Sequence, residues 1–208
     1  KKDYKIKKKL KVIKKIIPLI RVFFLFGFIF SNELEIGKKM PKMNFTLDGH
    51  DGMHLTLGDI KGRAGTLVIF SCNTCPWVIR WQDRYVSIAK QYSNKGIGII
   101  AVNSNVTKFN GDDSAIEMAK HAKKNNYNFP YVQDPGAKLA YAFGATKTPH
   151  VYLFDDKNTL VYRGAIDDNA RNESNVEEAF LINALNQMLA GEQITKPISK
   201  ALGCSIKF

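Results

Sequence analysis

Two cysteines separated by two residues are the side chains with the clearest chemistry in this chain. Cys72 and Cys75 directly follow an apolar, β-branched run, Leu67 to Phe70, and are themselves followed by Pro76. Helical spacing after Pro76 places the two cysteines where a strand gives way to a helix N-terminus. Unpaired N–H groups and the helix dipole stabilise a thiolate there, and the thiolate is the reactive form of cysteine. The spacing lets the two sulfurs close into a small, exchangeable disulfide, so we expect thiol–disulfide chemistry.

Other uses of the same cysteines have to be weighed. A structural zinc site needs four ligands and usually a second close pair, but only Cys204 and four scattered histidines remain. The sequence therefore predicts neither a metal site nor a cofactor. Three alternatives stay open: a carrier of zinc or copper, since thiolates suit Cu(I); two buried structural thiols without chemistry; and a redox-silent interaction domain.

The positive charge is concentrated at the beginning of the chain. The net charge is +12, and residues 1–30 hold ten Lys/Arg against one acid, which leaves only +3 for the rest. A nucleic-acid partner is therefore not expected. Residues 16–30 are apolar except for Arg21 and follow the lysine-rich stretch, as in a secretory signal peptide. We expect residues 1–30 to direct export, to a periplasmic or other extracytoplasmic location, with an uncleaved membrane tether through residues 16–30 as the alternative.

The remaining sequence indicates one domain with short appendages. We expect a linker over residues 31–43, a domain over residues 44–191 and a patternless C-terminal tail, 192–208, which carries Cys204. Alternating stretches around a turn predict an N-terminal β-hairpin. Further strands and helices alternate, which predicts an α/β fold with a mixed central sheet flanked by helices. The expected strands cover 67–71, 97–103, 129–133, 151–154 and 159–163, and the expected helices cover 76–94, 114–125, 137–143 and 174–190.

With these residues in view, the chain resembles the thioredoxin-like superfamily, specifically its redoxin branch, which includes peroxiredoxins. The matching pieces lie at 45–49 and 57–62, at the strand into Cys72-Asn-Thr-Cys-Pro, at Thr148-Pro149 and at 160–167. The resemblance implies a thioredoxin-like fold. It also implies that Pro149 is a cis-proline facing the dithiol, and that the backbone of Thr148 hydrogen-bonds a bound peptide.

The sequence also departs from thioredoxins. Asn73-Thr74 stand where thioredoxins commonly have Gly-Pro, and Ser71 precedes the first cysteine in place of Trp. Thr66 occupies the position of a buried Asp that accepts protons from the dithiol. Redox potential and proton transfer therefore cannot be carried over by analogy.

A thiol peroxidase is the alternative within the same superfamily. Peroxiredoxins use the pattern Pro-x-x-x-Thr/Ser-x-x-Cys, and neither Cys72 nor Cys75 fits it, because Gly65 and Val68 fall at the proline position. Arg163 is only a loose candidate for the activating arginine and is otherwise read as a surface or ion-pairing residue. Peroxide reduction is thus the minor interpretation.

The predicted activity is a thiol–disulfide oxidoreductase. We expect Cys72, nearer the helix start and more exposed, to attack, and Cys75 to resolve the mixed disulfide. The expected partners are protein or small-molecule disulfides and dithiols, with a separate electron donor or acceptor. Cys204 is either an idle thiol in a frayed tail or an accessory redox group. The neighbouring Asp167 and Asp168 are interpreted as loop charge.

Overall fold

The computed structural model describes residues 33–208. The expected export signal or anchor, including residues 16–30, lies outside the described residues. Among residues 33–208, no helix combines the length and the apolar character needed to cross a membrane.

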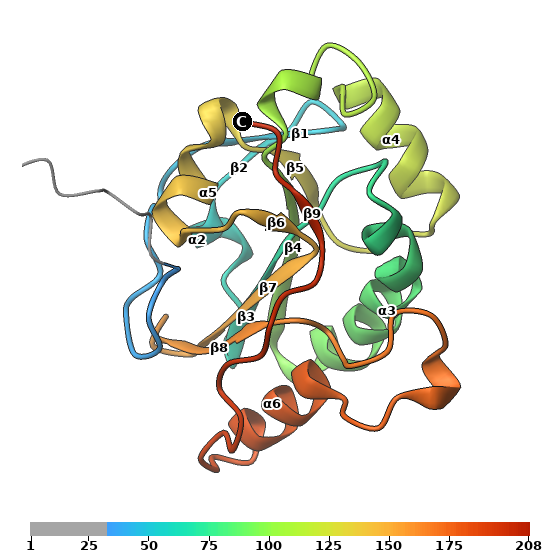
Figure 1. Ribbon diagram of the computed structural model, residues 1–208. Helices are drawn as coiled ribbons and strands as arrows, with labels where there is room; N and C mark the ends of the chain where they lie inside the picture. Colours follow the sequence, from blue (N-terminus) through green and yellow to red (C-terminus); the bar gives the residue numbers. More distant parts are fainter. Residues whose placement is uncertain (1–32) are drawn as a thin grey trace, which may run out of the picture. The chain divides into compact units, whose positions relative to one another are not determined.

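A seven-stranded sheet forms the centre of the domain (Figure 1). Its strand order is β2-β1-β5-β4-β3-β7-β8, in which β3, β4 and β5 are parallel and the other neighbours are antiparallel. The expected mixed sheet and N-terminal hairpin, β1 with β2, are therefore confirmed. The strands are β1 (Leu47–Gly49), β2 (His54–Leu55), β3 (Gly65–Phe70), β4 (Ile97–Asn103), β5 (Tyr131–Gln133), β7 (His150–Asp155) and β8 (Leu160–Gly164).

Helices pack against both faces of this sheet. Side chains of α3 (Pro76–Tyr92), α4 (Ala115–Lys124) and α6 (Phe180–Leu189) join one hydrophobic cluster. Side chains of α2 (Leu57–Ile60) and α5 (Lys138–Phe143) join the cluster on the other face. The connections within residues 33–208 include the short 3-10 helices η1 (Ser93–Lys95), η2 (Val106–Lys108), η3 (Pro135–Ala137) and η4 (Glu173–Asn175).

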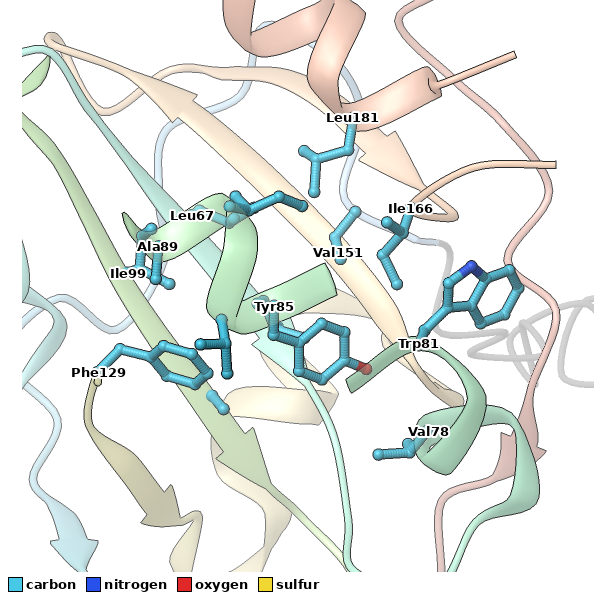
Figure 2. Close-up of a cluster of buried hydrophobic side chains, with 14 of the residues drawn as sticks. Leu67, Val78, Trp81, Tyr85, Ala89, Ile99, Phe129, Val151, Ile166 and Leu181 are labelled. Carbon is cyan, nitrogen blue, oxygen red and sulfur yellow. The ribbon is translucent and has the colours of Figure 1, made fainter. Parts of the chain in front are cut away.

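Strand β3 shows why the sequence folds in this way. Its side chains alternate between the two faces, so Leu67 and Ile69 belong to the first cluster and Val68 and Phe70 to the second. A strand covered on both faces needs apolar residues at every position, as expected of a central strand. Figure 2 shows Leu67 in the first cluster together with several side chains of α3. Packing on both sides fixes the strand that leads to the cysteines.

The last helix is shorter than its sequence suggests. A helix was expected from residue 174, but α6 begins at Phe180. The Asn172 side chain accepts a hydrogen bond from the Ser174 N–H and starts only the one-turn η4. Val176 then adopts an extended conformation, which ends that turn. Ser174, where the helix was expected to start, therefore lies inside an isolated turn capped by Asn172.

Both segments flanking the expected domain are hydrogen-bonded to it. Leu34 N–H donates to the Phe143 carbonyl at 2.9 Å, and Gly37 N–H donates to the Leu160 carbonyl at 2.8 Å. Near the other end, β9 (Cys204–Ser205) pairs with β6 (Lys147–Thr148) as a separate two-stranded sheet. Figure 1 shows the C-terminal segment running along β6. The tail is thus an ordered part of the fold.

Candidate active site

The two cysteines lie where β3 ends and α3 begins. Cys75 is the N-cap residue of α3, and Pro76 occupies the first helical position, where no N–H is needed. Cys72 is 2% exposed and Cys75 is 3% exposed. The expectation that Cys72 is nearer the helix start and more exposed is therefore wrong. Thr148 contacts both sulfurs, and the C-terminal segment contacts Cys75.

Thr148 and Pro149 face the cysteines across the site. The Thr148–Pro149 peptide bond is cis, as the family resemblance implied. Cys72 Sγ lies 3.3 Å from Thr148 Oγ1, and Cys75 Sγ lies 3.1 Å from the Thr148 carbonyl oxygen. Thr148 itself is buried. The fold thus brings together the dithiol and the dipeptide that the sequence singled out.

Cys204 is the third sulfur of the site. Its Sγ lies 2.7 Å from Cys75 Sγ, although 129 residues separate the two in the sequence. Cys204 is half-buried, and its backbone is paired in register with Thr148. The interpretation of Cys204 as a thiol in a frayed tail is therefore wrong. All three cysteines are reduced, without a disulfide.

The hydrogen bonds among these sulfurs give the three cysteines different pKa values. The hydrogen bond from the Cys72 thiol lowers the pKa of Cys75, and the Cys204 thiol and the backbone N–H of Val78 lower it further, to about 4. The same contact between the two sulfurs raises the pKa of Cys72, and burial acts in the same direction. Burial also raises the pKa of Cys204, to about 11. The reduced site therefore holds one negative charge, centred on the helix N-cap, with a thiol on either side.

The turn between the cysteines is held by residues that the sequence did not single out. Asp113 is fully buried and accepts a hydrogen bond from the Asn73 N–H at 2.8 Å. Its second oxygen accepts from the Asn105 side chain at 2.8 Å. The Tyr131 hydroxyl donates to Asn73 Oδ1 at 2.9 Å. The sequence offers only one signal for Asp113, which is that it directly precedes Ser114, the N-cap of α4.

The region behind the dithiol contains no carboxylate at the position that thioredoxins use. Thr66 is completely buried, and its hydroxyl has no hydrogen-bond partner among residues 33–208. His150 follows Pro149, and burial lowers its pKa to about 3, so its imidazole is neutral at physiological pH. Neither Thr66 nor the neutral His150 supplies the carboxylate that thioredoxins have at this position.

Arg163 and Asp167 both form ion pairs, as the interpretation of Arg163 expected and that of Asp167 did not. Arg163 forms an ion pair with Glu33, and its described contacts do not include a cysteine. Asp167, interpreted as loop charge, is only 5% exposed and forms an ion pair with Arg84. It also accepts a hydrogen bond from Trp81 Nε1 at 2.9 Å. Asp167 thus fastens the loop after β8 to helix α3. Asp168 is exposed, in agreement with its interpretation.

Among residues 33–208, no group of three or more His, Cys, Asp or Glu side chains is arranged to hold a metal ion.

Comparison with known proteins identifies the family. The Redoxin family model matches residues 35–180, which is more than half of the chain. The chain belongs to the redoxin family. The membership confirms the resemblance drawn from the sequence, and this redoxin has the thioredoxin-like α/β fold expected from it.

Individual relatives agree with this assignment. The crystal structure of an uncharacterized conserved protein from Geobacillus kaustophilus is 35% identical, with a TM-score of 0.77 over 85% of this chain and 94% of the other. The thiol-disulfide oxidoreductase ResA of Halalkalibacterium halodurans is 24% identical over 57% of this chain and 63% of that protein. The chloroplastic peroxiredoxin Q of Triticum aestivum is 24% identical over 62% of this chain and 58% of that protein. The chain thus spans less than two thirds of these two curated relatives.

Proposed function

We propose that this redoxin is a thiol–disulfide oxidoreductase that uses Cys72 and Cys75 to exchange disulfides with protein or small thiol substrates. The observation that carries the proposal is the geometry of the dithiol, which begins α3 and meets Thr148 beside the cis-Pro149. Both sulfurs contact the same residue, Thr148, which keeps them close to each other. The relative named as a thiol-disulfide oxidoreductase supports the same activity.

The proposed reaction is a pair of exchanges. The Cys72 sulfur attacks a substrate disulfide, forms a mixed disulfide and releases one substrate thiol. Cys75 then attacks Cys72 Sγ, forms the Cys72–Cys75 disulfide and releases the second substrate thiol. In the opposite direction, the oxidised site accepts electrons from substrate thiols. No cofactor takes part.

The contacts of Cys75 support this division of roles. Cys75 interacts with Cys72 and lies against Cys204 and the Thr148 carbonyl, so it is surrounded by groups of its own chain. This arrangement suits a resolving cysteine. Cys72 therefore remains for the substrate, and the two interacting sulfurs share one proton, so negative charge can move from Cys75 to Cys72 across their hydrogen bond.

The proposal also includes partners and location. Thr148 would hydrogen-bond the backbone of a bound substrate, because its own backbone already pairs with a strand in this structure. An electron donor or acceptor outside the chain would reset the dithiol. We retain export as a proposal, with a membrane tether through residues 16–30 as its variant.

A redox titration tests the proposal. The purified protein is equilibrated in glutathione or dithiothreitol buffers, its thiols are trapped and the products are measured by mass. We expect a reversible two-electron couple between Cys72 and Cys75. A midpoint potential of about −270 mV would indicate a reductant, and one of about −120 mV would indicate an oxidant. If no couple forms, the proposal fails, and stoichiometric metal in the reduced protein would favour a carrier.

Single substitutions test the roles. Cys72→Ser should abolish attack on a substrate disulfide, whereas Cys75→Ser should accumulate mixed disulfides through Cys72. Equal behaviour of the two variants would contradict the assigned roles.

Peroxide reduction is the second candidate, favoured by the similarity to a peroxiredoxin Q. Against it, Arg163 is engaged with Glu33, and its described contacts do not include a cysteine. Consumption of hydrogen peroxide with dithiothreitol as reductant distinguishes the two functions. Rapid turnover that depends on one cysteine alone would favour the peroxidase.

A further inference from the structure

The last residues of the chain occupy the place beside Pro149 where a substrate backbone would lie. Strand β9 pairs antiparallel with β6, so that Thr148 is opposite Cys204 and Lys147 is opposite Ser205. Addition of an extended segment to a free strand edge is a general mode of peptide binding. Here the chain's own C-terminus is the added strand.

Several contacts hold this segment at a defined position. Ile206 N–H donates to the Thr146 carbonyl at 2.9 Å, and the Ile206 side chain is 5% exposed within the second hydrophobic cluster. Lys207 N–H donates to Asn105 Oδ1 at 2.8 Å. The Phe208 ring stacks on Tyr141, with 4.7 Å between the ring centres. The position of Cys204 is therefore set on one side by backbone pairing and on the other by an apolar anchor.

Gly203 shows how closely the segment approaches. A Cβ atom at this position would lie 2.3 Å from the Thr148 carbonyl oxygen, which is closer than real Cβ contacts. Because that oxygen belongs to the backbone beside the cis-proline, a side chain at 203 would push the strand away. The glycine thus permits the approach that brings Cys204 Sγ to 2.7 Å from Cys75 Sγ.

We propose that Cys204 is a third redox-active cysteine, which takes over the disulfide from the Cys72–Cys75 pair as a Cys75–Cys204 disulfide. This inference rests on the proposed oxidoreductase function. In the exchange, the Cys204 sulfur attacks Cys75 Sγ, the Cys72–Cys75 bond breaks and the Cys75–Cys204 bond forms. The proton of Cys204 passes to Cys72, and no electrons enter or leave the protein.

The proposed exchange moves the disulfide to a more exposed sulfur. Cys72 and Cys75 are 2% and 3% exposed, whereas Cys204 is half-buried. A disulfide that includes Cys204 therefore has one sulfur that an external thiol can reach. A dithiol reductant attacks Cys204, forms a mixed disulfide with it and releases Cys75 as a thiol. The second thiol of the reductant then closes its own disulfide and frees Cys204.

The test of the bond uses variants that each keep two cysteines. Cys72→Ser is oxidised in glutathione buffers, alkylated in acid and mapped by peptide mass. We expect the Cys75–Cys204 disulfide within one chain as the main product. In Cys75→Ser, a Cys72–Cys204 disulfide should be at least tenfold less abundant, because Cys204 contacts the other sulfur.

A second pair of variants tests the placement. Adding Gly203→Ala to Cys72→Ser should reduce the yield of the Cys75–Cys204 disulfide at least tenfold. Adding Ser205→Ala, an exposed neighbour on the same strand, should leave the yield within about twofold. Free thiols at 75 and 204 in oxidised Cys72→Ser, or disulfides only between chains, would overturn the inference.

The rate of reduction tests whether Cys204 makes the disulfide accessible to an external thiol. In oxidised wild-type protein, single-turnover reduction by dithiothreitol should be at least tenfold faster than in Cys204→Ser. Equal rates would overturn the relay. Because the Cys72–Cys75 couple can be titrated in Cys204→Ser itself, loss of the relay and loss of the oxidoreductase function are distinguishable.

Discussion

At the scale of single residues, the site is organised around the sulfur of Cys75. It is the helix N-cap, it contacts sulfur on two sides, and it faces the Thr148 carbonyl. The sequence could predict the dithiol and its helix start, because both depend on local order along the chain. It could not predict the contact with Cys204, since that contact depends on where a distant segment docks. Nor could it predict exposure, which led to the wrong expectation for Cys72.

Titration of the reduced protein tests the proposed charge distribution. We expect one thiolate per chain at neutral pH, because the Cys75 pKa is lowered to about 4 while that of Cys204 is raised to about 11. Thiolate absorbance followed against pH measures this. Cys72→Ala removes the main hydrogen-bond donor and should move the Cys75 pKa upward, with a smaller upward shift in Cys204→Ala. A wild-type protein without thiolate at neutral pH would contradict the assignment.

The lowered pKa of Cys75 also makes the free energy of unfolding depend on pH. The pKa of Cys75 in the folded state lies below the ordinary thiol value of about 8.5 that applies to the unfolded chain. Its contribution to the free energy of unfolding is therefore fully present above that unfolded value. It is lost progressively as the pH falls through about 4. Reduced Cys75→Ser should lack this part of the pH dependence.

At the scale of elements, local pattern was a reliable guide where it extended over several residues. The alternation of faces in β3 and the apolar run of β4 both predicted buried strands, because burial on two faces leaves a continuous signature. The start of α6 was mispredicted, because the polar residues around 174 form only a single turn, and the helix begins later, at Phe180. Asp167 was misread for a related reason: its partner Arg84 lies 83 residues away.

Asp167 should be important for the stability of the fold. Asp167→Ala would leave the buried Arg84 guanidinium without its carboxylate and the Trp81 N–H without its acceptor. Breaking one partner of a buried ion pair costs about 3–5 kcal/mol. Denaturant unfolding of the reduced protein measures the change in free energy of unfolding.

The adjacent aspartate supplies a matched control for this substitution. Asp168 is exposed, and its carboxylate accepts a hydrogen bond from the Glu177 N–H at 3.2 Å. Asp168→Ala should therefore change the free energy of unfolding by no more than about 1 kcal/mol. Equal losses for the two substitutions would show that the Arg84–Asp167 contact does not stabilise the fold.

At the scale of the whole molecule, the C-terminal segment closes the domain over its own dithiol. The backbone edge beside Pro149, where a substrate would bind, is occupied by β9. A protein substrate that pairs with Thr148 must therefore displace residues 203–206. The sequence could not indicate this arrangement, since a two-residue strand has no periodic pattern and its partner strand lies more than fifty residues earlier.

Loosening the apolar anchor should open the site. Ile206→Ala removes most of a side chain that is 5% exposed in the second hydrophobic cluster, and such truncations cost about 2–5 kcal/mol. Because modification of a covered group follows the population of the open form, part of this cost should appear as faster alkylation of Cys75. A local loss of only about 1.4 kcal/mol already corresponds to a tenfold change. We therefore expect iodoacetamide to modify Cys75 at least tenfold faster in reduced Ile206→Ala than in the wild type.

The control for this prediction lies on the same segment. Leu202 is 38% exposed, so Leu202→Ala should change the alkylation rate by no more than about twofold. Chemical denaturation of each variant gives its global unfolding constant. If the C-terminal segment opens locally, the alkylation rate of the variant rises by a larger factor than its unfolding constant does. If Ile206→Ala alkylates at the wild-type rate, or only in proportion to its global unfolding, the tail is not the cover of the dithiol. If the acceleration is local, access of substrates to Cys72 and Cys75 is governed by the C-terminus of the same chain.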